Sequence, residues 1–261
     1  MSSISKAKAL LSRVLSGSAE PSPSQQQPQR PKRERADRKE RFTQGENWKH
    51  GILSHRLYES YEHYLQHQRS KLKRIKRGLE AKGPEKIKVF KRRFELAPLK
   101  PASSVLCLGA RLGHEVMAFI ELGHFAVGID LYPGEQNSHV MVGDFHHLVF
   151  ADHSVDCVYI NSLDHIHQLE PFVAEVNRVL KPDGLFLADI VHGYEEGFIA
   201  GEFEAMHWPT ARTFAGELAR LGNFDIVSST DLKDVGSPRW VQFVFRPRGS
   251  SDLVHEHQDS R

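Results

Sequence analysis

The chain has 261 residues, of which 39% are hydrophobic and 26% are charged, which suits one globular domain with tails at about 150 residues per domain. No apolar run reaches the length of a membrane span. The only two cysteines, Cys107 and Cys157, fall in expected core strands, which fits reduced thiols in a cytoplasmic protein better than a disulfide framework. Residues 1–100 carry 25 Lys and Arg against 10 Asp and Glu, whereas residues 101–261 carry 10 against 23.

The first 47 residues are too polar to bury a core. Residues 1–16 have apolar side chains at helical spacing, three basic residues and no acidic one, a composition compatible with organellar targeting. Residues 17–47 are rich in Pro, Ser and Gln and then in Arg. We expect residues 1–47 to form a disordered basic tail, with targeting by residues 1–16 as an alternative to a purely cytoplasmic location.

Residues 48–100 are interpreted as a basic helical extension. One helix is expected from about Trp48 to Gly78 and a second after Pro84, ending before Pro98. The apolar positions expected on the inner side are Leu53, Leu57, Tyr61, Tyr64, Leu65, Leu72 and Ile75 in the first helix and Ile87, Phe90 and Phe94 in the second. The basic residues within 30–93 are either ordinary solvated charges or an arm that binds nucleic acid or another polyanion.

A strand, a glycine turn and a helix follow one another after Ser104. Four consecutive apolar residues, 105–108, are typical of a strand buried on both faces, and residues 114–122 have a helical pattern. Glycine in the connecting turn lets backbone N–H groups approach a ligand closely. The next strand ends at Asp130, 17 positions after Gly113, where a carboxylate can accept hydrogen bonds from both hydroxyls of a ribose. The unit predicts a site for a nucleotide-like cofactor.

The rest of the chain alternates between strands and helices. Strands are expected near 104–108, 125–129, 140–142, 156–160, 185–190, 224–230 and 240–245, with helical segments between most of them. This order predicts a doubly wound α/β domain over residues 101–248, followed by a polar tail at 249–261.

Three motifs in order are similar to those of class I S-adenosylmethionine-dependent methyltransferases. The turn from Gly109 to Gly113 resembles the family's G-x-G-x-G turn, residues 142–156 resemble its acidic turn and next strand, and residues 175–189 resemble its helix-to-strand segment. The resemblance covers roughly residues 90–247. It implies a seven-stranded, mostly parallel, Rossmann-like sheet with an antiparallel last strand, and S-adenosylmethionine as the cofactor.

The resemblance also implies the cofactor-binding residues. Asp130 would take the ribose hydroxyls, Asp144 would face the adenine amino group, and Phe145 would flank the adenine ring. The full set expected to bind the cofactor is Gly109, Ala110, Gly113, Asp130, Leu131, Asp144, Phe145 and Asn161.

The chain departs from the family's pattern at three positions. Cys107 replaces an acid common in the first strand, Arg111 replaces the central glycine of the turn, and Asp183 replaces the first glycine of a Pro-Gly-Gly run. The arginine can point outward, fill the cofactor pocket or pair with the methionine carboxylate.

The acceptor side is expected just after the fourth strand, in the run from Asn161 to His167, because the carboxyl ends of parallel strands meet at the ligand cleft. His165 is the candidate catalytic base, and the plainer interpretation is a histidine satisfied by Asp164 or by the backbone. Relatives that use Mg²⁺ place an acid, an Asp and an Asn where this chain has Asn161, Asp189 and Ile190, so only one carboxylate remains and we expect no metal site.

The expected function is methyl transfer from S-adenosylmethionine to a small molecule, without a metal ion. The alternative is a non-catalytic protein of the same fold that acts as a scaffold through its basic N-terminal region. An NAD-dependent oxidoreductase is disfavoured because the glycine spacing does not fit the dinucleotide fingerprint and no Tyr-x-x-x-Lys pair is recognisable.

Overall fold

The computed structural model describes residues 48–249, except that the side chains of residues 72–81 are not described. The expectations for the tail at 1–47 and for residues 250–261 lie outside this range.

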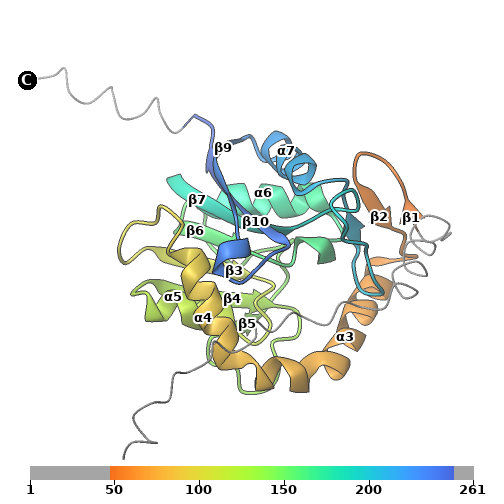
Figure 1. The fold of residues 1–261 in the computed structure, drawn as a ribbon, viewed down its shortest axis with the longest axis horizontal. Helices are drawn as coiled ribbons and strands as arrows, with labels where there is room; N and C mark the ends of the chain where they lie inside the picture. Colours follow the sequence, from red (N-terminus) through yellow and green to blue (C-terminus); the bar gives the residue numbers. More distant parts are fainter. Residues whose placement is uncertain (1–47, 250–261) are drawn as a thin grey trace, which may run out of the picture. The chain divides into compact units, whose positions relative to one another are not determined.

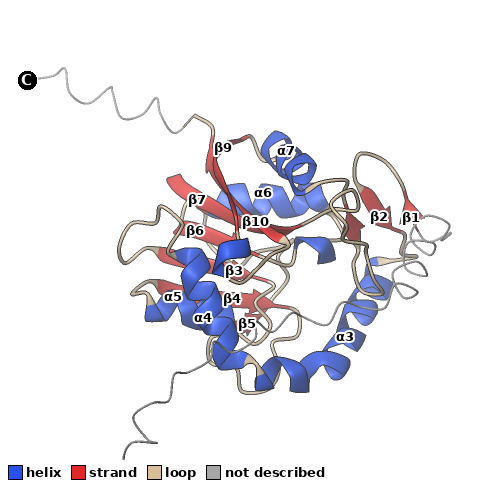
Figure 2. Ribbon diagram, in the orientation of Figure 1, coloured by secondary structure: helices blue, strands red, loops and turns tan. Residues whose placement is uncertain are grey.

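A seven-stranded sheet forms the centre of the domain (Figures 1 and 2). Its strands are β3 (Ser104–Leu108), β4 (Phe125–Asp130), β5 (Val140–Val142), β6 (Val155–Ile160), β7 (Leu180–Val191), β9 (Phe224–Asp231) and β10 (Trp240–Pro247). They are arranged in the order β5-β4-β3-β6-β7-β10-β9, and β10 pairs antiparallel with both β7 and β9, whereas the other pairs are parallel. The predicted mostly parallel sheet with an antiparallel last strand is confirmed.

The chain leaves β3 toward β4 and β5 and then returns to the other side of β3 as β6. In an open α/β sheet such a reversal leaves a crevice at the carboxyl ends of the strands on either side of it. The fold therefore predicts a ligand site beyond the ends of β3, β4 and β6.

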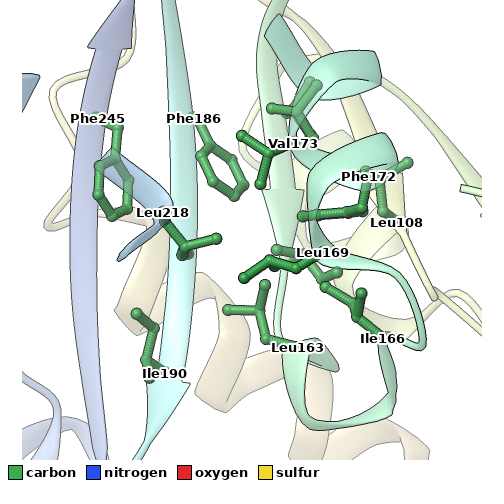
Figure 3. Close-up of a cluster of buried hydrophobic side chains, with 14 of the residues drawn as sticks. Leu108, Leu163, Ile166, Leu169, Phe172, Val173, Phe186, Ile190, Leu218 and Phe245 are labelled. Atoms are coloured by element: carbon green, nitrogen blue, oxygen red, sulfur yellow. The ribbon is translucent and has the colours of Figure 1, made fainter. Parts of the chain in front are cut away.

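Helices cover both faces of the sheet. On one face α6 (Leu169–Val179) and α7 (Ala211–Leu221) enclose a core that includes Phe172, Phe186 and Leu218 (Figure 3). On the other face, α4 (Gly83–Phe94) and α5 (His114–Glu121) cover the side chains of Val105 and Cys107. Burial on both faces explains why the strands are continuous apolar runs. Both cysteines are buried and free, as expected.

Helix α4 is part of the core. Phe94 stacks on Phe119 of α5 with ring centroids 3.6 Å apart, and Phe90 is also buried, as the sequence predicts. Arg93 is directed inward and pairs with Asp189 at 2.8 Å, with both side chains buried. Arg93 therefore cannot contribute to a solvent-facing basic arm.

The expectation of a helix from Trp48 is wrong for its first dozen residues. Strand β1 (Trp48–Lys49) pairs with β2 (Ser54–Arg56), which also pairs with β8 (Met206–His207), and α3 (Tyr61–Ala81) begins only after them. Strand β2 pairs with a strand about 150 residues further along the chain, which local periodicity cannot reveal. Leu53 and Tyr64 are buried as expected, but Leu57 is 53% exposed.

None of the helices within residues 48–249 combines the length and the apolar character that crossing a membrane requires.

Candidate active site

The turn after β3 is left-handed at three positions, with φ of 66° at Gly109, 44° at Arg111 and 78° at Gly113. Glycine adopts such angles readily, whereas a side chain makes them costly. The backbone N–H of Ala110 donates to the carbonyl of Ile129 at 3.0 Å and so ties the turn to β4. The arginine at the central position therefore keeps the turn conformation that a glycine would favour.

The carboxylate of Asp130 is held at the end of β4 by two backbone N–H groups. Arg111 donates to Oδ2 at 3.0 Å and Tyr132 donates to Oδ1 at 2.7 Å. A carboxylate oxygen has two lone-pair directions, so each oxygen keeps one for a further donor. Asp130 is thus fixed in orientation and able to accept hydrogen bonds from a diol.

Two neighbouring cavities lie beyond the strand ends. The larger has a volume of about 300 Å³, the smaller has about 50 Å³, and five residues line both: Lys71, Gly109, Arg111, Ser162 and His165. Of the predicted site residues, Ala110 and Asn161 line the larger cavity. Asp130, Leu131 and Phe145 line the smaller one. The structure brings these predicted residues together with Gly109 and His165.

Two predicted cofactor residues line neither cavity. A Cβ on Gly113 would lie 3.0 Å from Cγ2 of Val140, so this glycine serves the packing of the turn against β5. Asp144 lies beneath α3, where the hydroxyl of Tyr61 donates to Oδ2 and the backbone N–H of His146 donates to Oδ1 at 2.9 Å.

The charge of Asp144 is stabilised by these contacts. Burial opposes ionisation, but hydrogen bonds from His146 and Tyr61 outweigh it and lower the pKa of Asp144 to about 2. Its role toward an adenine amino group stays a prediction, since Tyr61 occupies one of its oxygens in this structure.

His165 lies between the cavities and the loop before β8. Its Nδ1–H donates to the carbonyl of Phe203 at 3.0 Å, so the free lone pair is on Nε2, which is in contact with Nζ of Lys71. Asp164 is beyond hydrogen-bond distance, with Oδ1 3.7 Å from Nε2. The plainer interpretation named two partners for His165. The structure has the hydrogen bond to the backbone but none to Asp164. The catalytic role of His165 stays a prediction.

The pKa values of His165 and Lys71 are both lowered. Burial lowers the pKa of His165, and the charge of Lys71 lowers it further. Burial also lowers the pKa of Lys71 to about 8, with a smaller contribution from Arg111. At neutral pH the two groups therefore share one readily lost proton, located on the lysine.

Several functional candidates were missed by sequence reasoning. Lys71 stands in a basic run of the sequence, and no local feature distinguishes it from its neighbours. It reaches the site because α3 crosses the strand ends. There the hydroxyl of Tyr64 donates to the carbonyl of His165 at 3.0 Å. Lys86 of α4, Glu115 of α5 and Glu204 of the loop before β8 also line the larger cavity. The sequence offered one sign that Glu115 is functional, which is that an acidic residue lies on the apolar face of the predicted helix.

Ser162 carries an unsatisfied polar group at the centre of the site. Its Oγ is buried and has no hydrogen-bond partner among the described residues. A Cβ added to Gly109 would lie 2.1 Å from this oxygen, so only glycine leaves room for it. Buried hydroxyls normally find a partner, which indicates that this one is placed for a ligand.

The carboxylate of Asp189 is directed away from the cavities. It accepts from Arg93 at 2.8 Å, from Tyr159 at 2.7 Å and from Gln242 at 3.0 Å, and the residue is fully buried. Within the described part of the chain there is no group of three or more His, Cys, Asp and Glu residues that could hold a metal ion.

Comparison with known proteins found one matching family model and similar solved structures. Residues 106–188 match the model of the family described as "Methyltransferase domain". The chain is similar to the structure of 1,6-didemethyltoxoflavin-N1-methyltransferase from Burkholderia thailandensis with bound 1,6-didemethyltoxoflavin and S-adenosylhomocysteine. Their identity is 17%, with 76% of this chain and 98% of that chain covered and a TM-score of 0.59.

A second similar structure comes from the complex between the Trm112 methyltransferase activator and the putative methyltransferase of Haloferax volcanii. Here identity is 17%, 64% of this chain and 93% of that chain are covered, and the TM-score is 0.52. No curated protein matches the chain. At these identities the solved structures establish the fold.

Proposed function

We propose that this chain is a class I S-adenosylmethionine-dependent methyltransferase. It binds S-adenosylmethionine and transfers the methyl group to a small-molecule acceptor without a metal ion. One observation carries the proposal. The carboxylate of Asp130 is held by two backbone N–H groups beside a left-handed glycine turn, at the point where the strand order reverses.

The residues around the cavities fit this cofactor in three respects. Asp130 has lone pairs available for the ribose diol, and Phe145 and Tyr132 supply apolar surface for the adenine ring in the smaller cavity. The larger cavity has charged groups of both signs, which suits the zwitterionic methionine end. The unpartnered Oγ of Ser162, between the cavities, supplies one more polar contact.

When bound, S-adenosylmethionine supplies a methyl group on a sulfonium. The chain must then hold the acceptor in line with the S–CH₃ bond and manage one proton. His165 is oriented by its Nδ1–H bond to Phe203, which directs Nε2 toward Lys71. With Lys71 neutral, the pair can take a proton from an alcohol. An amine or thiolate acceptor needs no such help.

The absence of a metal step is supported by Asp189. Its carboxylate is already committed to three buried donors, and its neighbour Ile190 has no side-chain ligand. Mg²⁺ takes near-octahedral oxygen coordination, commonly including carboxylates. Asn161 is the one remaining position of the three that relatives use for metal.

The test is binding followed by acceptor profiling. Calorimetry should give heat with both S-adenosylmethionine and S-adenosylhomocysteine, and Asp130→Ala should weaken both by more than about tenfold. Transfer of labelled methyl groups into fractions of small metabolites, RNA and protein then identifies the acceptor class. Equal binding by Asp130→Ala, or no heat with either ligand, contradicts the proposal.

A non-catalytic scaffold is the second candidate, favoured by the bond from Tyr61 to Asp144, which covers the expected adenine contact. In that case Tyr61→Phe should change nothing measurable about cofactor binding, because none occurs. If the protein is a methyltransferase, freeing Asp144 in Tyr61→Phe should maintain or tighten binding of S-adenosylhomocysteine.

A further inference from the structure

The larger cavity contains a buried carboxylate, that of Glu115, in addition to the groups described above. Glu115 lies in the first turn of α5, is 6% exposed and lines the cavity together with Lys86 and Arg111. No ion pair of Glu115 occurs within residues 48–71 and 82–249, where side chains are described. An acid is rarely buried without a paired charge.

The position of Glu115 explains a departure in the glycine-turn strand. Cys107 stands where relatives of this fold carry an acid, and its side chain faces the layer of α4 and α5, the same side as Glu115. Burial first, and then the charge of Glu115, raise the pKa of the Cys107 thiol. The chain therefore supplies from the helix a carboxylate that the strand lacks.

Two cations line the same cavity. Burial raises the pKa of Glu115 to about 7, although the charges of Lys86 and Arg111 both act to lower it. The guanidinium of Arg111 has no hydrogen bond or ion pair to any side chain in the described part of the molecule. A buried acid beside an unpaired guanidinium is complementary to an α-amino acid group, which carries an ammonium and a carboxylate on one carbon.

We propose that Glu115 binds the ammonium group of the cofactor's methionine moiety and that Arg111 binds its carboxylate. This assignment rests on the proposed function and adds to it the recognition of the amino acid end. Other acids of the cavity are less suited. Asp164 lies next to Lys71 and His165, and Glu204 accepts the backbone N–H of Gly201 at 2.6 Å.

The test compares analogues of S-adenosylhomocysteine by calorimetry on the full chain. The parent should bind S-adenosylhomocysteine roughly 10- to 100-fold more tightly than its deaminated analogue. Glu115→Gln should bind the two equally within about twofold, because the variant has lost the group that distinguishes them. Affinity for 5′-methylthioadenosine, which lacks the amino acid entirely, should be the same in both proteins.

The control is Glu121→Gln, the same substitution in the same helix at a half-exposed residue that pairs with Lys91 on the surface. It should retain the discrimination in full. If the parent binds neither S-adenosylhomocysteine nor 5′-methylthioadenosine, the proposed function is overturned together with this assignment. If the parent binds S-adenosylhomocysteine and Glu115→Gln still rejects the deaminated analogue, the assignment to Glu115 alone is overturned.

Discussion

The hydroxyl of Ser162 occupies the space that a side chain on Gly109 would need, because an added Cβ would lie only 2.1 Å from Oγ. Gly109 follows strand β3 and begins the cofactor turn, and Ser162 follows the neighbouring strand β6. The close approach joins the cofactor side of the site to its acceptor side. Any residue larger than glycine must therefore displace the serine.

Gly109→Ala should lower the stability of the domain and abolish cofactor binding. The left-handed φ costs about 1–2 kcal/mol for a non-glycine residue, and the clash with Ser162 adds roughly 1–3 kcal/mol of overpacking. At about 2–4 °C per kcal/mol for a domain of this size, the melting temperature should fall by several degrees.

A double variant separates the two causes. In Gly109→Ala combined with Ser162→Ala, the nearest atom is Cβ of residue 162 at 3.3 Å, which a small shift can accommodate. The double variant should melt between the parent and Gly109→Ala. A double variant no more stable than Gly109→Ala would show that the backbone, and not the hydroxyl, sets the requirement for glycine.

Most of the sheet was predictable because strands buried on both faces are continuous apolar runs with glycine turns between them. The predicted bounds of β3 and β5 agree with the structure, and β4 and β6 differ by one residue. Strand β7 begins five residues earlier than expected, at Leu180, and a register shift separates the pair of Val155 and Leu180 from the regular pairing that resumes at Leu185. Local composition gives no sign of such an extension.

The site was predictable where the backbone alone determines position. Asp130 is the last residue of β4 and Gly109 directly follows β3, and the pairing of these two strands brings them together. Lys71 and Glu115 depend on how α3 and α5 pack against the strand ends, and packing at that level is set by contacts distant in sequence, such as the bond from Tyr64 to the carbonyl of His165. Nothing in the local pattern distinguishes them from surface charges.

Glu115 should make the folded protein less stable at alkaline pH. Burial raises its folded pKa from 4.5 to about 7, so the unfolded chain loses this proton first and stability falls as pH rises from 4.5 to 7. The groups that face it are Lys86 of α4, Arg111 of the turn, Asp130 of β4, Cys107 of β3 and Tyr159 of β6.

Glu115→Gln removes this ionisation and should be more stable than the parent at pH 8, by an amount on the order of 3 kcal/mol, with little difference at pH 5. Thermal unfolding at the two pH values measures both differences. A gain in stability together with weaker cofactor binding is expected of a ligand-binding acid. A variant less stable than the parent at both pH values would assign Glu115 a structural role.

The pair of Lys71 and His165 should give turnover a dependence on pH if the acceptor is an alcohol. Burial lowers the pKa of Lys71 to about 8, and the pair can accept a proton only when the lysine is neutral. Turnover should therefore rise about tenfold per unit below pH 8 and level off above it. The measurement is the rate of methyl transfer to the identified acceptor from pH 6 to pH 9.5.

Two variants test the assignment. His165→Ala should lose about 10²–10⁴-fold in turnover, and Lys71→Met should lose the pH dependence along with activity. The matched control is Lys91→Met, which removes a surface lysine paired with Glu121 and should leave the profile unchanged. A flat profile in the parent would show that no proton is taken by this pair and would favour an amine or thiolate acceptor.

Methyl transfer should survive exhaustive chelation, since Asp189 serves the core and not a metal. Its carboxylate balances the buried charge of Arg93 and accepts from Tyr159 and Gln242.

Asp189→Asn should leave Arg93 without its counter-charge and reduce stability by roughly 3–5 kcal/mol, which thermal unfolding measures. The control Ser237→Ala removes a hydroxyl that accepts from Arg93 but keeps the ion pair, so the cost should be nearer 1 kcal/mol. Loss of turnover on chelation with recovery on adding Mg²⁺, together with an Asp189→Asn variant as stable as the parent, would place a metal at the end of β7 after all.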